Sequence, residues 1–235
     1  MHKIQFNIKY IQCIFPVFFF FLFHPAPAQD LIVISNSREY EKLVGGDSLQ
    51  KMTELKTFLP GAVYDLRYGT KTNFTGRKLY KQNDKTFVRL AVAQALQKAG
   101  QELLSLGYRI KIWDAYRPYS ITKKMWDLIR DERYVANPAK GSGHNRGLAV
   151  DITLVVANTG AEVDMGTGFD NFTDTAHHAF KNLSEDILQS RLLLKTTMEK
   201  CGFRALETEW WHYSFPNNRN YEVLDLPFKK LAKYR

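Results

Sequence analysis

Cysteine is scarce in this sequence, which has only 2 cysteines in 235 residues. Two cysteines exclude a disulfide framework and any zinc site built from several thiolates. The sequence has no internal repeat, which argues against a solenoid, and no Gly/Ser-rich or Pro-rich linker divides it after residue 28. With 24% charged and 14% aromatic residues, the composition excludes a disordered or low-complexity protein. The length suits a single domain with a full-sized core.

The first 28 residues have the three parts of a secretory signal peptide. Lys3 and Lys9 supply positive charge, an apolar stretch runs from Ile11 to Phe23, and Ala26-Pro27-Ala28 forms the cleavage pattern. The apolar stretch of 13 residues is short for a bilayer span, which needs about 20. An uncleaved N-terminal anchor is the alternative.

We therefore predict a signal peptide at residues 1–28 and one domain at residues 29–235, exported to the periplasm. No stable membrane insertion is expected after cleavage. The formal net charge of +9 would suit a nucleic-acid binder. The sequence, however, lacks a helix with clustered Arg and Lys, and an exported protein is badly placed to meet nucleic acid. We expect no nucleic-acid partner.

Apolar spacing predicts helices and strands that alternate without a regular βαβ rhythm, which favours an α+β fold. The expected helices lie within 87–106, at 118–129 and after Ser184, and the expected strands are 108–115, 148–156 and 203–215. The C-terminal segment 216–235 is expected to be a polar, basic tail.

A histidine and an aspartate stand seven positions apart in the segment richest in chemical groups. His144 follows a glycine on a turn, and Asp151 lies inside an apolar strand beside Val150 and Ile152. Burying an aspartate there is costly unless its charge is compensated. A divalent cation shared with His144 would compensate it; a nearby arginine is the alternative.

A second segment, Glu209-Trp210-Trp211-His212, carries one carboxylate and one imidazole. If His144, Asp151 and His212 converge, they form a site of the kind in which catalytic zinc keeps a fourth position for water. Glu209 would then act as general base. Positions 209 and 212 of a regular strand face opposite ways, so a bulge or turn is required.

A third segment, Trp113–Pro118, lies at a strand end. The planar fork of Arg117 suits an oxyanion or a carboxylate, and a surface salt bridge is its alternative role.

Together these segments resemble the D-alanyl-D-alanine dipeptidases of the vancomycin-resistance type, within the zinc D,D-peptidase family. The matching elements span nearly all of residues 29–235: Asn73–Gly76, Trp113–Pro118, Ser142–Thr153, Met165–Asp170 with His177-His178, and Glu209–Tyr213.

The resemblance implies a compact α+β domain with a mainly antiparallel sheet, flanking helices and one Zn²⁺ per chain. It makes His144, Asp151 and His212 the metal ligands, Glu209 the general base and Arg117 the group that stabilises the oxyanion. The implied reaction is hydrolysis of the small-molecule substrate D-Ala-D-Ala.

The resemblance also implies a small, closed pocket that excludes longer peptides. Ser142, Tyr68 and Asp170 are further candidates for binding the substrate termini. A free α-amino group needs an acidic or carbonyl partner, which Asp170 could supply. The adjacent His177 and His178 project in different directions, so we do not expect both to bind one ion and instead expect them to support the structure or to orient the metal ligands.

The predicted export distinguishes this chain from the resistance-associated relatives, which act on a cytoplasmic precursor. It indicates a role in scavenging of dipeptide or in wall recycling instead. A zinc D,D- or L,D-carboxypeptidase that trims longer stem peptides is the nearest alternative. A non-catalytic peptidoglycan-binding domain is another, but it would be expected to lack Glu209 or one of the three ligands.

Overall fold

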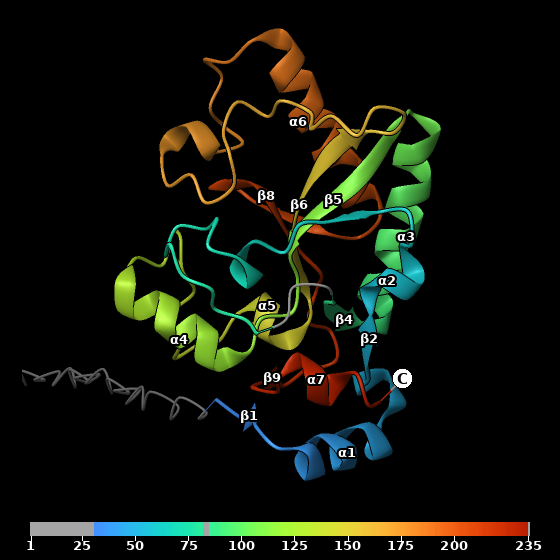
Figure 1. The fold of residues 1–235 in the computed structure, drawn as a ribbon, viewed down its shortest axis with the longest axis vertical. Coiled ribbons are helices and arrows are strands. Elements are labelled where there is room, and N and C mark those ends of the chain that lie inside the picture. The colour runs from blue at the N-terminus through green and yellow to red at the C-terminus, as the bar shows by residue number, and fades with distance from the viewer. Residues whose placement is uncertain (1–30, 82–84, 235) are drawn as a thin grey trace, which may run out of the picture. The chain divides into compact units, whose positions relative to one another are not determined.

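The structure is a computed structural model that describes residues 31–81 and 85–234. The predicted signal peptide at residues 1–28 lies outside these ranges. The described residues belong to one compact unit, Leu31–Arg235, in which helices and strands are mixed (Figure 1). The predicted α+β fold class is confirmed.

The centre of this unit is a five-stranded sheet in the order β3-β5-β6-β8-β7. Its strands are β3 (Val63–Tyr64), β5 (Tyr108–Asp114), β6 (Ala149–Val156), β7 (Arg204–Leu206) and β8 (Glu209–Ser214). The pairing of β3 with β5 is parallel, and the other pairings are antiparallel. The sheet is therefore mainly antiparallel, as predicted.

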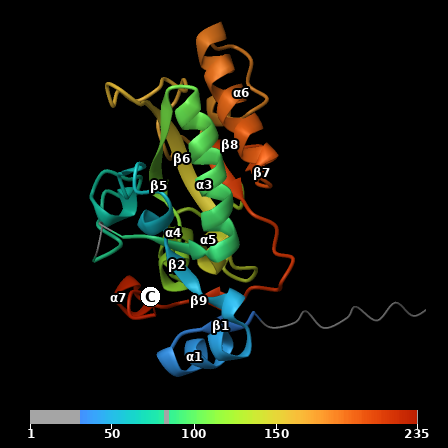
Figure 2. The same cartoon turned by 90° about the vertical axis from the view of Figure 1, so that its right-hand side faces the viewer.

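Two long helices, α3 (Leu90–Ser105) and α6 (Glu185–Lys200), lie together over one face of this sheet (Figure 2). Leu96 of α3 and Ile152 of β6 are fully buried in the same core cluster. Because side chains alternate across a strand, Asp151 points to the opposite face of the sheet. The functional groups therefore gather on the face that these two helices leave open.

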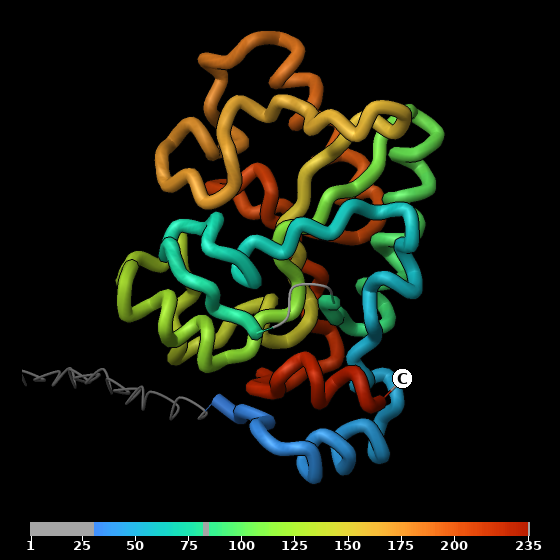
Figure 3. The backbone as a smooth tube through the Cα atoms, in the orientation of Figure 1, coloured from blue at the N-terminus to red at the C-terminus, as the bar shows by residue number. Residues whose placement is uncertain are grey.

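Two small sheets complete the fold. β2 (Met52–Glu54) pairs antiparallel with β4 (Phe87–Arg89), and β1 (Val33–Ile34) pairs parallel with β9 (Val223–Leu224). Figure 3 shows this second pairing, in which the early blue segment runs beside the late red one. The remaining helices are α1 (Ser37–Gly46), α2 (Leu55–Phe58), α4 (Tyr119–Leu128), α5 (Gly143–Arg146) and α7 (Phe228–Leu231), with 3₁₀ turns η1 (Ser48–Gln50), η2 (Arg67–Gly69) and η3 (Asp174–Ala176). No helix in the described ranges has the length and apolarity to cross a membrane.

Two predicted elements differ from the structure. The single strand expected over 203–215 is a hairpin of β7 and β8. The polar tail expected over 216–235 contains β9 and α7 and buries Leu226 and Leu231. These few buried residues stand among lysines and asparagines, so the sequence carries too short a periodic pattern to predict an element there.

Candidate metal centre and active site

His144 lies in α5, a single helical turn with a capping residue at each end. The Ser142 hydroxyl accepts a hydrogen bond from the Asn145 amide at 3.1 Å, and the Asn145 side chain accepts one from the Ser142 amide at 3.0 Å. This reciprocal cap begins the turn. Gly147 ends it with a φ of 70°, in the left-handed region that favours glycine. The turn holds His144 only 3% exposed.

Asp151 and His212 are register partners on the antiparallel strands β6 and β8. Directly opposed residues of such strands project to the same face. Glu209 reaches that face as well, because the register of β7 against β8 shifts between Ala205 and Leu206. The irregularity that residues 209 and 212 require is therefore present.

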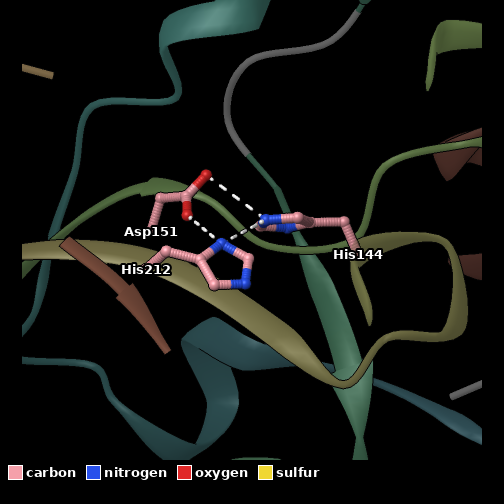
Figure 4. A group of neighbouring side chains, drawn as sticks. All are labelled: His144, Asp151 and His212. Atoms are coloured by element: carbon pink, nitrogen blue, oxygen red, sulfur yellow. Dashed lines mark hydrogen bonds and ion pairs between the residues drawn. The ribbon is translucent and has the colours of Figure 1, made fainter. Parts of the chain in front are cut away.

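The three side chains proposed as ligands point toward one another (Figure 4). Asp151 Oδ1 lies 2.9 Å from His212 Nδ1, and Asp151 Oδ2 lies 3.4 Å from His144 Nε2. The two imidazole nitrogens that face each other, His144 Nε2 and His212 Nδ1, are 3.2 Å apart. One ligand atom from each residue lies within 4.8 Å of the others. A single cation can therefore contact all three.

The outer nitrogen of each imidazole has its own partner. His144 Nδ1 lies 2.7 Å from the Ala115 carbonyl, which can only accept, so Nδ1 carries the proton and Nε2 offers its lone pair to the site. His212 Nε2 lies 2.9 Å from the Ser214 hydroxyl, leaving Nδ1 for the site. Such outer partners orient imidazoles that bind a metal.

The charge of the site also suits a cation. Burial alone would raise the pKa of Asp151, but His144 and His212 hold it well below its ordinary range, so the carboxylate is ionised. Two imidazoles and one carboxylate form a ligand set that catalytic zinc uses. These residues therefore fit a zinc ion.

Glu209 stands beside this group. It is 7% exposed, and its Oε2 lies 3.9 Å from His212 Nδ1. Burial, together with the negative charges of Asp151 and Asp170, raises the pKa of Glu209 well above its ordinary value. Glu209 is therefore a carboxyl group placed beside the three proposed ligands, where it can exchange a proton with a water.

Arg117 reaches the same cavity but is held by a carboxylate that the sequence reasoning did not select. Its Nε and Nη2 atoms donate to Asp114 Oδ2 at 2.9 and 2.8 Å, and the Tyr80 hydroxyl donates to Asp114 Oδ1 at 3.0 Å. Nη2 also lies 3.7 Å from Asp151 Oδ2. Burial opposes the charge of Arg117, but Asp114, Tyr68, Tyr80 and Asp151 together outweigh it and raise the pKa of the guanidinium.

These groups line a cavity of about 300 Å³, at the lower end of the roughly 300–1,000 Å³ typical of ligand pockets. All three candidates for binding the substrate termini, Ser142, Tyr68 and Asp170, line it too. The Tyr68 hydroxyl donates to Asp170 Oδ1 at 2.8 Å, and the Tyr68 ring lies 4.9 Å from the Arg117 guanidinium carbon.

Asp114 is the main functional residue that sequence reasoning missed. It is a buried carboxylate at the end of an apolar strand, the same signal that identified Asp151. His177 and His178 do not line the cavity; burial lowers the pKa of His178 to about 4, which keeps it neutral. Among the described residues, the group that could hold a metal ion is His144, Asp151 and His212, without His177 or His178.

The sequence of this chain is similar to those of several known proteins. A family model described as D-ala-D-ala dipeptidase, of the M15 peptidases, matches residues 48–233. The D-alanyl-D-alanine dipeptidase of Escherichia coli is 31% identical over 174 residues, covering 74% of this chain and 89% of its own. The enzyme of the same name from Enterococcus faecalis is 35% identical over 179 residues, covering 68% of this chain and 88% of its own.

A likeness to solved structures is weaker. The vancomycin resistance D,D-pentapeptidase VanY in complex with Zn(II) is 17% identical, with a TM-score of 0.38, and the match covers 57% of this chain and 75% of that one.

Proposed function

This chain belongs to the D-ala-D-ala dipeptidase family and is a zinc metallopeptidase with a peptidoglycan-related peptidase activity; within that family we propose that it hydrolyses the D-Ala-D-Ala dipeptide to two molecules of D-alanine. The observation that carries the proposal is the convergence of His144, Asp151 and His212 beside Glu209 in one small cavity.

His144 Nε2, Asp151 and His212 Nδ1 would hold one zinc ion. When bound, zinc polarises the scissile carbonyl, lowers the pKa of an adjacent water toward neutrality, and favours the carboxylate form of Glu209 through its positive charge. Glu209 takes a proton from the attacking water as the water oxygen bonds to the carbonyl carbon. The same carboxyl group gives that proton to the amine nitrogen when the C–N bond breaks.

Arg117 stabilises the negative charge that develops on the carbonyl oxygen, because Asp114 holds its guanidinium in place before the substrate binds. At the substrate's amino end, the Asp170 carboxylate pairs with the α-ammonium group. At the other end, the Ser142 hydroxyl donates to the terminal carboxylate. Tyr68 contacts both Arg117 and Asp170, so we assign it to positioning these two residues.

A dipeptidase assay tests the proposal directly. D-alanine release from D-Ala-D-Ala should be abolished by a chelator and restored by zinc. Glu209→Ala should lower kcat by roughly 10²-fold or more while zinc remains bound, as metal analysis of the purified protein would show. Glu207→Ala is the matched control, because Glu207 is an exposed glutamate two positions away. A folded wild-type protein that releases no D-alanine with zinc present would refute the dipeptidase assignment.

We also propose that the chain is exported and acts on dipeptide outside the inner membrane, in scavenging or wall recycling. The signal-peptide pattern of residues 1–28 supports this location. Protease added to spheroplasts should degrade the protein, and a fully protected protein would refute export.

A further inference from the structure

Three aromatic side chains from three separate segments meet at one side of the cavity. The Phe172 ring lies 5.3 Å from the ring of Phe74 and 4.8 Å from the ring of Tyr134, measured between centroids. Phe74 belongs to the segment after η2, Tyr134 to the segment after α4, and Phe172 to the segment before η3. We call these three residues the aromatic cluster.

The three residues of the aromatic cluster differ in whether they line the cavity. Phe74 and Tyr134 line it, whereas Phe172 does not. Phe172 contacts both wall residues from outside and so connects two parts of the wall that come from different segments. Aromatic pairs at these separations attract each other beyond the gain from their buried area. The contacts of Phe172 therefore keep this part of the wall closed.

Further contacts stabilise the part of the wall that contains Tyr134. The Arg133 guanidinium lies 5.1 Å from the centroid of the Tyr134 ring, and its Nη2 donates to Asp131 Oδ2 at 2.6 Å. The Arg133 carbonyl accepts a hydrogen bond from the Thr208 hydroxyl at 3.3 Å. These contacts tie the Tyr134 segment to the turn between β7 and β8, which ends at Glu209.

The cluster is adjacent to the group that we assign to the substrate's amino end. Phe172 follows Asp170 by two residues, and the backbone of Phe74 is close enough to the Asp170 carboxylate to act against the rise in its pKa. Tyr68, which donates to the same carboxylate, has its ring 6.2 Å from that of Phe74. A substrate whose amine pairs with Asp170 would therefore end against the aromatic cluster.

We propose that the aromatic cluster sets the length limit of the substrate by closing the cavity beyond the α-amino group, with Phe172 as the residue that holds the closure. The inference rests on the proposed dipeptidase function. In D-Ala-D-Ala the amine ends the chain. In a longer peptide the same nitrogen is acylated by a preceding residue, so it carries no charge and cannot form the ion pair with Asp170. The preceding residue would also need the volume that Phe74 and Tyr134 occupy.

The test compares two substrates, D-Ala-D-Ala and the tripeptide L-Ala-D-Ala-D-Ala, by the release of D-alanine. The wild-type protein should cleave the dipeptide and largely reject the tripeptide. Phe172→Ala should raise the ratio of kcat/KM for tripeptide over dipeptide by about tenfold or more, the effect of relieving a clash of one or two methylene groups. Tyr134→Ala, which opens the same wall from the other side, should raise this ratio too.

Two further variants separate closure from a general loss of stability. Phe172→Leu keeps much of the apolar contact and should keep most of the discrimination. Phe58→Ala removes a half-buried phenylalanine that lies at a different cavity, and it should leave the ratio unchanged.

The outcomes distinguish the two proposals. A wild-type protein inactive on the dipeptide contradicts the proposed function itself. A wild-type protein that cleaves the tripeptide as readily as the dipeptide contradicts the length limit. The third outcome concerns the cluster alone. Its role is contradicted if the wild-type protein is active but Phe172→Ala and Tyr134→Ala, both folded by circular dichroism, gain no tripeptide cleavage.

Discussion

Asp170 combines an uncommon backbone conformation with a carboxylate aimed into the cavity. Its φ is 59°, in the left-handed region that aspartate tolerates better than most residues. Burial and the negative charge of Asp151 raise the pKa of Asp170 to about 7, although the hydrogen bond from Tyr68 acts against the shift. The residue therefore changes charge near neutral pH.

This pKa predicts the pH dependence of substrate capture. Below about 7 the Asp170 carboxyl is protonated and cannot pair with an α-ammonium group, and above that pH it is ionised. The kcat/KM for D-Ala-D-Ala should therefore rise with pH through this region, because kcat/KM reports groups of the free enzyme. Initial rates at low substrate concentration over a pH series would measure it.

Asp170→Asn should lower kcat/KM and remove this rise. Asp164→Asn, at an exposed aspartate in the same loop, should retain it. A wild-type profile that stays flat through this region would contradict the assignment, as would an unchanged rise in Asp170→Asn.

At the residue scale, functional side chains could be predicted where a purely structural role would cost free energy. Asp151 stood out because an ionised carboxylate in an apolar strand requires compensation. His144, which would share a cation with Asp151, and Arg117, which offers the alternative compensation, both lie beside it. The salt bridge of Arg117 with Asp114 is buried at the cavity rather than exposed on the surface. That pairing depends on a strand irregularity between Ile112 and Asp114, which no spacing rule reveals.

At the scale of elements, a buried arginine connects α5 to distant segments. Arg89, at the end of β4, is 0% exposed. It donates through Nε to the Arg146 carbonyl at 2.8 Å, through Nη2 to the Glu222 carbonyl at 3.3 Å, and through Nη1 to the Gln50 carbonyl. Arg146 is the last residue of α5, so Arg89 anchors the turn that carries His144.

Arg89→Met should therefore destabilise the protein strongly. It leaves the buried carbonyls of Gln50, Arg146 and Glu222 without this donor, at about 1–3 kcal/mol for each buried acceptor left unsatisfied. We expect a loss of roughly 3 kcal/mol or more in the free energy of unfolding, measured by urea denaturation. Arg38→Met, at an exposed position of α1, should change it by less than about 0.5 kcal/mol. Equal effects of the two substitutions would contradict this role of Arg89.

The main helices and strands could be predicted because their apolar residues repeat over several turns or alternations. The expected strands 108–115 and 148–156 correspond to β5 and β6, and the helix after Ser184 corresponds to α6. The hairpin of β7 and β8 could not be predicted in this way. Its turn, Glu207-Thr208, is only two residues long and contains no glycine or proline to mark it.

At the scale of the whole molecule, the proposed ligands join α5, β6 and β8. A ligand that binds only the folded state stabilises it by about 2.7 kcal/mol when its concentration is 100 times its Kd. For a chain of this size, each kcal/mol corresponds to roughly 2–4 °C in Tm. Removal of zinc by a chelator should therefore lower Tm by several degrees, and added zinc should restore it.

Differential scanning calorimetry of the purified protein, with and without chelator, would measure this shift. His212→Ala should abolish the zinc-dependent part of Tm. His178→Ala, which changes a histidine outside the metal group, should retain it whatever its own effect on Tm. Persistence of the full shift in His212→Ala would exclude His212 as a ligand.

Asp151 pairs directly with His212 across β6 and β8, so metal binding also depends on the correct register of these two strands. A slip of one residue between two strands turns the side chains of one strand to its other face. A chain misfolded in this way would bury Asp151 beneath α3 and α6 and would leave His144 and His212 without their carboxylate. Zinc uptake thus depends on strand register, and a folded protein that fails to bind added zinc would be expected to contain misregistered sheets.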